Sequence, residues 1–324
     1  MINKRNKSLA QYLDVFVNEL LKSVALIQGA GFLSGKSGIA ILLYYYARYM
    51  QDVKISEYAD TLTDIILDEI SVDAGLDFDK GICGTVWAIN KLVKSGFIQA
   101  DEDVFEDIDS ELFKETKRKF SLENFGEESW RGIYILNRLQ SATQHTEPVW
   151  RQRTKEYLQL ICQLLKLRYA THSVPVLTCK NLLPVIYICS ELWNNDRYAI
   201  EINLLLNELP VVTKVALKEE KNYGDKYVLH QLLSKLPFFK DLFTVSIPES
   251  ATLMDVNRFY LNRWIVASDI SVPKIISDAL INIVGDKKRM DEWLFLLNPD
   301  NAELGNYAGG LAWAMLQQCM EAAI

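Results

Sequence analysis

Acidic side chains gather just before several apolar segments of this chain. Asp77 and Asp79 precede Gly81, Glu127 and Glu128 precede Gly132, and Glu303 precedes Gly305. Two carboxylates held across a sugar-sized gap act as general acid and general base in glycoside hydrolysis. Carboxylates at helix N-termini also bind free N–H groups and complement the helix dipole. Capping is the favoured interpretation, and Asp79, Glu128 and Glu303 are the candidate catalytic residues if the chain is an enzyme.

Soft ligands for a metal ion are present but widely spaced. The candidate set is Cys162, His172, Cys179 and Cys189. Their spacing does not resemble the compact ligand pairs of zinc sites. The chain has five cysteines, an odd number, and no C-x-x-C pair, which favours reduced thiols in the core. The sequence therefore predicts no metal site and no cofactor, and no histidine is placed as the base for a nucleophile.

Aromatic side chains supply a second kind of candidate site. Trp130 and Tyr307 lie near the starts of apolar segments, where they would form a platform for a peptide or a sugar. The stretch 101–128 carries 11 acidic and four basic residues. Its ordinary interpretation is a solvated outer helix, and the alternative is an acidic docking face for a basic peptide.

The segments that carry these residues have helical periodicity and open with small residues. They cover 35–43, 81–89, 129–136 and 305–313, with a weaker example at 182–189. Gly38 and Gly84 are 46 residues apart. Asn90 and Asn137, each followed by a basic and an apolar residue, are 47 apart, and the same step recurs at Asn262. A period in the high forties predicts one helical hairpin per repeat.

More polar, amphipathic segments lie between these apolar ones, at 56–70, 102–119, 150–169 and 274–284. A helix that is apolar nearly all round must be enclosed, and amphipathic helices can cover it. We therefore predict an all-α fold, an α/α-toroid of five to six helical hairpins that forms one domain over 1–324. An open α-solenoid is the alternative.

The predicted inner helices start near the small residues that open each apolar segment. These starts are Gly38, Gly84, Gly132, Pro184 and Gly310, with one more near Asn257. The stretch 222–255 lacks a clear pattern of this kind and is interpreted as irregular, the remains of one degraded repeat.

The repeated openings resemble the lanthionine synthetase cyclase-like (LanC-like) family, whose repeats read small-x-x-Gly-Ile-small followed by apolar residues. The segments 35–43, 81–89 and 305–313 fit this pattern, and 129–139 is similar to its Gly-Ile-x-Leu-x-x-Arg-Leu variant. The resemblance implies an α/α-toroid and a peptide substrate. Catalytic members hold zinc through Trp-Cys-x-Gly and Cys-His-Gly motifs, and this sequence has neither. The resemblance therefore implies the fold of the family without its zinc.

Composition excludes several other classes of protein. The formal net charge of −7 disfavours a nucleic-acid binder, which usually carries a basic face. The longest apolar run, 39–46, is far shorter than the roughly 20 residues that a membrane helix needs. The first 26 residues contain no uninterrupted apolar signal core, so we expect a cytoplasmic protein without membrane insertion.

Three functions remain open at this point. The first is a LanC-like protein without zinc that binds a peptide and assists its modification. The second is a glycosidase-like α/α-barrel enzyme that uses Asp79 with Glu128 or Glu303. The third is a non-catalytic interaction module.

Overall fold

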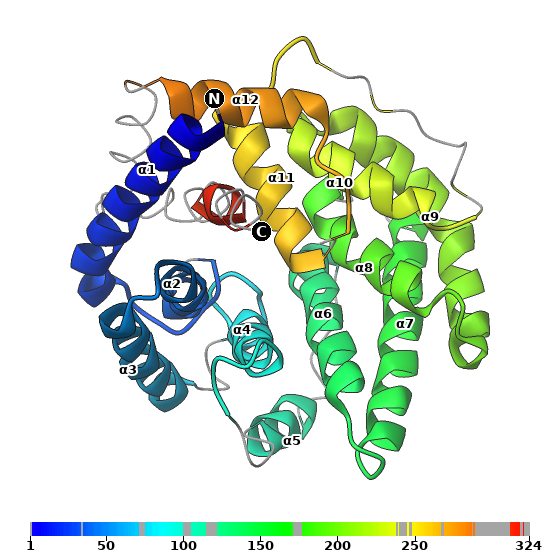
Figure 1. Ribbon diagram of the computed structural model, residues 1–324. Helices are drawn as coiled ribbons and strands as arrows, with labels where there is room; N and C mark the ends of the chain where they lie inside the picture. Colours follow the sequence, from blue (N-terminus) through cyan, green and yellow to red (C-terminus); the bar gives the residue numbers. More distant parts are fainter. Residues whose placement is uncertain are drawn as a thin grey trace.

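The computed structural model describes most of the chain, in segments separated by gaps. These segments are 2–33, 35–70, 75–99, 105–114, 122–170, 177–237, 239, 245, 248–266, 269–286, 288, 312–317 and 320. Every regular element in them is a helix, and no strand occurs within these segments (Figure 1). The prediction of an all-α fold is therefore confirmed.

Twelve α-helices follow one another in the described segments. They are α1 Ile2–Ser23, α2 Lys36–Met50, α3 Val53–Glu69, α4 Ile82–Lys94, α5 Glu106–Lys114, α6 Phe125–Ser141, α7 Glu147–Ala170, α8 Cys179–Leu192, α9 Ala199–Glu219, α10 Tyr223–Ser234, α11 Leu253–Val266 and α12 Lys274–Gly285. A short helical segment covers 312–317. Within the described segments, no helix has the length and apolar character to cross a membrane.

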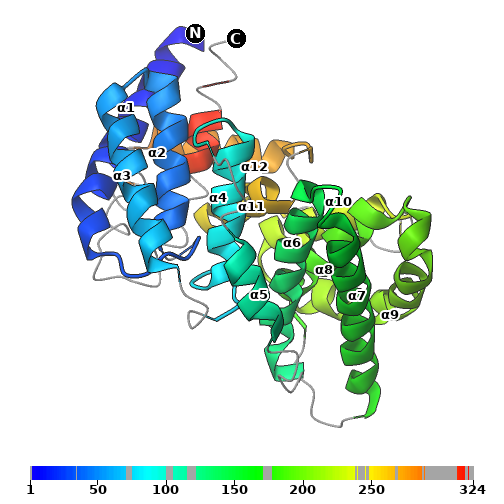
Figure 2. The ribbon, with the colours of Figure 1, turned by 90° about the horizontal axis from the view of Figure 1, so that it is seen from below.

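The helices form an inner and an outer layer (Figures 1 and 2). In the inner layer α2, α4, α6, α8, α10 and α11 contact one another in succession. In the outer layer α3 packs on α2, α7 on α6, α9 on α7 and α8, and α12 on α11. The burial of each helix follows its layer. Every residue of α4 from Ile82 to Asn90 is buried, whereas α3 buries only Ala59, Leu62, Thr63 and Ile66.

The two ends of the described chain meet and close the ring. Helix α12 contacts α1. The Trp313 ring lies 4.9 Å from that of Tyr45 on α2, edge to face. On the other side of the same short segment, Arg263 Nη1 of α11 donates to Gln317 Oε1 at 2.9 Å. These contacts favour the predicted α/α-toroid over an open solenoid, in which the first and last repeats would lie apart.

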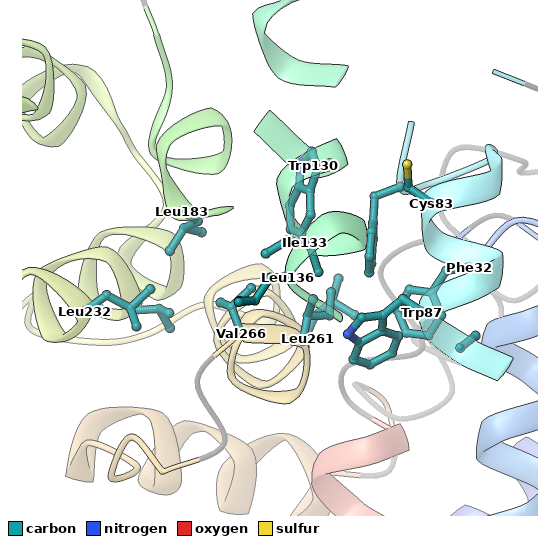
Figure 3. Packing of buried hydrophobic residues seen from close by; sticks show 14 of the residues in the cluster. Phe32, Cys83, Trp87, Trp130, Ile133, Leu136, Leu183, Leu232, Leu261 and Val266 are labelled. Atoms are coloured by element: carbon teal, nitrogen blue, oxygen red, sulfur yellow. The ribbon is translucent and has the colours of Figure 1, made fainter. Parts of the chain in front are cut away.

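The middle of the ring is filled by apolar side chains from the inner helices (Figure 3). Trp87 of α4, Ile133 of α6, Leu183 of α8, Leu232 of α10 and Leu261 of α11 all belong to one buried cluster. Because each of these helices contributes to the same cluster, none of them can bury its apolar face without its neighbours.

The small-residue openings before α2 and α4 are two copies of one loop. Gly29 and Gly75 both have a φ of 78°, a left-handed conformation that favours glycine. The Gly29 carbonyl accepts from Lys36 N at 3.1 Å, and the Gly75 carbonyl accepts from Ile82 N at 3.0 Å. The 46-residue repeat thus includes the loop as well as the helix that follows it.

Two of the inner helices begin earlier than the small residues predicted. Helix α8 begins at Cys179, where Thr178 and Asn181 form a capping box, so Pro184 lies inside the helix. Proline has no N–H to donate to the Lys180 carbonyl, so one intrahelical hydrogen bond is missing in the second turn of α8. Helix α6 begins at Phe125 rather than near Gly132. The predicted start near Gly310 lies outside the described residues.

The expected irregular stretch 222–255 contains helix α10, so this part of the prediction is wrong. Asn222 caps the helix by accepting from Asp225 N at 3.0 Å. Its buried apolar residues, Val228, Leu229, Leu232 and Leu233, have helical spacing but occupy little more than two turns. Such a short pattern is weak in sequence, and packing against α8 and α11 stabilises it.

The asparagines of the repeated Asn-basic-apolar motif join neighbouring inner helices through side-chain hydrogen bonds. Asn90 Nδ2 on α4 donates to Asn137 Oδ1 on α6 at 2.6 Å. Asn262 Nδ2 on α11 donates to Asp225 Oδ1 on α10 at 2.5 Å. Each bond satisfies polar groups that are otherwise enclosed between apolar helices, which explains why this residue type recurs there.

Candidate functional site

The N-terminal ends of neighbouring inner helices lie at one rim of the ring, together with the two repeated loops. Leu33 N in the first loop donates to the Asp79 carbonyl in the second at 3.0 Å. Phe78 of the second loop stacks on Trp130 near the start of α6, with ring centroids 4.7 Å apart. A Cβ on Gly126 of α6 would lie 2.7 Å from Asn181 Nδ2 of α8. We call this rim the mouth, defined by loops 29–35 and 75–81 and the first turns of α6, α8, α10 and α11.

The predicted acidic residues have different surroundings at the mouth. Asp77 Oδ1 accepts from Lys80 N at 2.6 Å and so stabilises its own turn. The Asp79 side chain is partly exposed, and it interacts electrostatically with Lys180 across the mouth. Glu128 is only 5 % exposed and is ion-paired with Arg131, at 3.4 Å between Oε2 and Nη1. Glu303 lies outside the described residues, as does the side chain of Glu127.

The predicted aromatic platform is largely enclosed. Trp130 is 6 % exposed and packs on Phe78, so most of its surface already has a partner. Figure 3 shows it among the apolar side chains of the ring. Tyr307 lies outside the described residues.

Sequence reasoning missed a group of charged side chains that the fold brings together at the mouth. Lys180 is the second residue of α8, Asp225 lies in the first turn of α10, and Arg258 lies on α11. All three interact electrostatically with one another, and Lys180 also interacts with Asp77 and Asp79. The sequence signal was a single charged residue near the start of each apolar helix, and nothing local indicated that these residues would meet.

Burial shifts the pKa of two members of this group. Desolvation lowers the pKa of Lys180, and the positive charge of Arg258 acts in the same direction. Desolvation raises the pKa of Asp225, which is 4 % exposed, while Arg258 and the hydrogen bond from Asn262 oppose that change. Lys180 and Asp225 are therefore partly dehydrated, and charges of both signs act on them.

The cysteines do not fit the zinc site of the family's catalytic members. Cys83, Cys179 and Cys189 are fully buried. Burial raises the pKa of each thiol, that of Cys189 to about 12, which disfavours the thiolate that binds metals. Within the described part of the chain, no three histidine, cysteine, aspartate or glutamate side chains are grouped to hold a metal ion. His172, another candidate ligand, lies outside the described residues.

The acidic stretch 101–128 is not simply a solvated face. Asp109 of α5 is 8 % exposed, and its Oδ2 accepts from Arg138 Nη2 at 2.6 Å and from Nε at 3.1 Å. The Tyr134 hydroxyl donates to Oδ1 of the same carboxylate. Glu106, three residues earlier, is exposed. At least one acid of this stretch therefore anchors the outer helix α5 to α6.

Comparison with known proteins points to one family. Residues 3–136 match the family model described as lanthionine synthetase C-like protein. No curated protein and no solved structure matches the chain. The matched part covers α1 to α4, α5 and most of α6, including both glycine loops and the acidic residues at 77, 79 and 128. Residues 3–136 are therefore similar to the lanthionine synthetase C-like family.

Proposed function

We propose that the protein binds a peptide at the mouth of the ring and assists its modification. The observation that carries this proposal is the convergence of charged side chains from four elements at the mouth, in a space that is partly dehydrated. Lys180, Asp225 and Arg258 come from three inner helices, and Asp79 comes from loop 75–81. The family match supplies the class of ligand, since the resemblance implies a peptide substrate.

A peptide suits this arrangement because it carries charges of both signs as well as backbone donors and acceptors. Acidic side chains and a C-terminus would pair with Lys180 or Arg258, and basic side chains or an N-terminus with Asp79. Recognition by such pairs in a partly dehydrated space favours specificity over raw affinity. Tyr307 and Trp130 remain proposed contacts for the same peptide.

The glycosidase-like alternative has less support. It needs two open carboxylates, and Glu128 is buried and ion-paired with Arg131. Asp79 would then have to work with Glu303, which lies outside the described residues. A purely structural interaction module would explain the closed ring but not the convergence of charged side chains at its mouth. We therefore keep Asp79, Glu128 and Glu303 as candidates for an acid–base role that is secondary to peptide binding.

The test is a binding measurement with peptides encoded beside the gene for this protein. The wild-type protein should bind at least one of them, and Asp79→Asn should weaken the binding. Asp64→Asn is the matched control, because Asp64 is an exposed acid on the outer helix α3. Fluorescence anisotropy of labelled peptides gives the three dissociation constants. Absence of binding to every such peptide would refute the peptide function, and equal binding by all three proteins would remove Asp79 from it.

A further inference from the structure

A cluster of arginine and aromatic side chains lies where α5 and α7 meet the outer side of α6 (Figure 2). The guanidinium of Arg153 on α7 lies over the ring of Phe113 on α5, with Cζ 3.5 Å from the ring centre. Arg131 of α6 lies against the same ring, at 5.0 Å. The Trp150 ring lies 5.0 Å from Arg153 Cζ and meets Phe113 edge to face at 5.6 Å. These distances bring two guanidinium groups, from two helices, to one aromatic ring.

Arg153 has donors that the surrounding chain does not satisfy. Its Nη1 atom is buried and has no hydrogen-bond partner among the described residues. The two rings attract its positive charge, but a guanidinium has five N–H donors that lie in its plane and need acceptors. Buried polar groups of folded proteins nearly always have a partner in the protein, in water or in a bound ion. The atom therefore points to an acceptor from outside the described chain.

The neighbouring arginines differ from Arg153 because each has a carboxylate. Arg138, which also lies against Trp150, donates to Asp109 at 2.6 Å. Arg131 Nη1 lies 3.4 Å from Glu128 Oε2, whereas charge-assisted bonds of this kind measure about 2.7–2.9 Å. The long distance leaves much of the Arg131 charge to act on its surroundings. Burial lowers the pKa of Arg153, and the positive charge of Arg131 acts in the same direction.

We propose that Arg153 binds an oxyanion, the carboxylate or phosphate group of a ligand, with the charge of Arg131 adding to the attraction. Phe113 and Trp150 fix the plane of the guanidinium, and its fork of N–H donors matches two oxygens of such a group. Arg153 as a whole is partly exposed, which gives a ligand access from solvent. The site involves the outer helices α5 and α7, so it does not depend on peptide binding at the mouth.

Urea unfolding of the intact protein tests this site, with sodium acetate or sodium phosphate replacing sodium chloride at constant ionic strength. A ligand that binds only the folded protein stabilises it. The unfolding equilibrium constant of the wild type should therefore fall by about tenfold when the bound anion reaches nine times its Kd. Arg153→Gln should lose this response. Arg197→Gln, the matched control, replaces an exposed arginine and should keep it.

The comparison between proteins separates specific binding from general salt effects. Constant ionic strength keeps the screening of surface charges equal, and exclusion of the anions from the protein surface stabilises all three proteins alike. A specific response to acetate would identify the ligand group as a carboxylate, and a specific response to phosphate would identify it as a phosphate. Either of these results supports the site.

An equal response of the wild type and Arg153→Gln to both anions would overturn the proposal. So would a wild-type protein that neither anion stabilises more than chloride does. Arg153→Lys covers the case in which Arg153→Gln does not fold, because it keeps the positive charge but loses the fork of donors. Its Kd for the anion should rise by about tenfold, the effect of one lost charge-assisted bond, and an unchanged Kd would also refute the site.

Discussion

Replacing Gly84 by alanine should destabilise the protein, although alanine is the better helix former. Gly84 lies in the first turns of α4, where its substitution by alanine would otherwise stabilise the helix by about 1 kcal/mol. An added Cβ would lie 2.8 Å from Phe32 Cβ and 2.9 Å from the Phe78 carbonyl carbon, and closer still to the Phe78 oxygen. Ordinary contacts begin at about 3.4 Å, so the loop must move.

The free energy needed to move the loop decides whether Gly84→Ala stabilises or destabilises the protein. Overpacking costs about 1–3 kcal/mol, and the upper part of this range applies because the obstacle is backbone. Phe78 is also held by stacking on Trp130, which resists displacement. After the helix gain is subtracted, the expected loss of unfolding free energy is about 2 kcal/mol.

Urea unfolding followed by circular dichroism at 222 nm measures this loss. Gly96→Ala is the control, because its Cβ would meet nothing within 4 Å and only the φ of 67° opposes it. That variant should lose about 1 kcal/mol from backbone strain alone. A Gly84→Ala protein that is as stable as the wild type, or more stable, would refute the close approach of loop 75–81 to α4.

Three further predictions concern buried charge and metal content. Asp109→Ala should lower the unfolding free energy by about 3–5 kcal/mol because it removes the carboxylate that accepts two hydrogen bonds from the buried guanidinium of Arg138, whereas exposed Glu106→Ala should change it by less than about 0.5 kcal/mol in the same urea assay. Burial raises the pKa of Asp225 above 3.8, so the folded state holds this proton more tightly and the unfolding free energy falls as the pH rises through the raised pKa. Asp225→Asn should therefore gain stability relative to the wild type as the pH rises above 3.8 and through the raised pKa of Asp225, and a gain that does not grow with pH in this range would contradict this. Elemental analysis of the purified protein should find no stoichiometric zinc, and about one zinc per chain would show that cysteine ligands form a site after all.

Much of the architecture could be predicted from local patterns. The small-residue openings at 35–38 and 81–84 gave the starts of α2 and α4 within two residues, because a helix that begins beside a crossing loop needs glycine at the contact. The start of α8 was misplaced at Pro184, because the capping residue Thr178 lies six residues earlier and carries a weaker signal. Helix α10 was missed because its two apolar turns are stabilised by neighbouring helices more than by their own sequence.

The candidate site could be predicted only in part. The acidic residues at the mouth were recognised in sequence, but whether each is open or enclosed depends on its neighbours. Glu128 became part of a buried ion pair, and Asp79 stayed partly exposed. The charge group of Lys180, Asp225 and Arg258 spans 78 residues of sequence and three helices, so no local motif could reveal it.

The sequence alone determined the class of fold, the repeat of one helical hairpin and the likeness to one family, because helical periodicity and glycine spacing are properties of neighbouring residues. Closure of the ring and the burial of each charge were decided by the tertiary structure. Both depend on which distant helices meet: Tyr45 with Trp313 at the closure, and α8, α10 and α11 at the mouth. The strength of a charge interaction depends on how much water the surrounding helices exclude, and that exclusion exists only once the ring has closed.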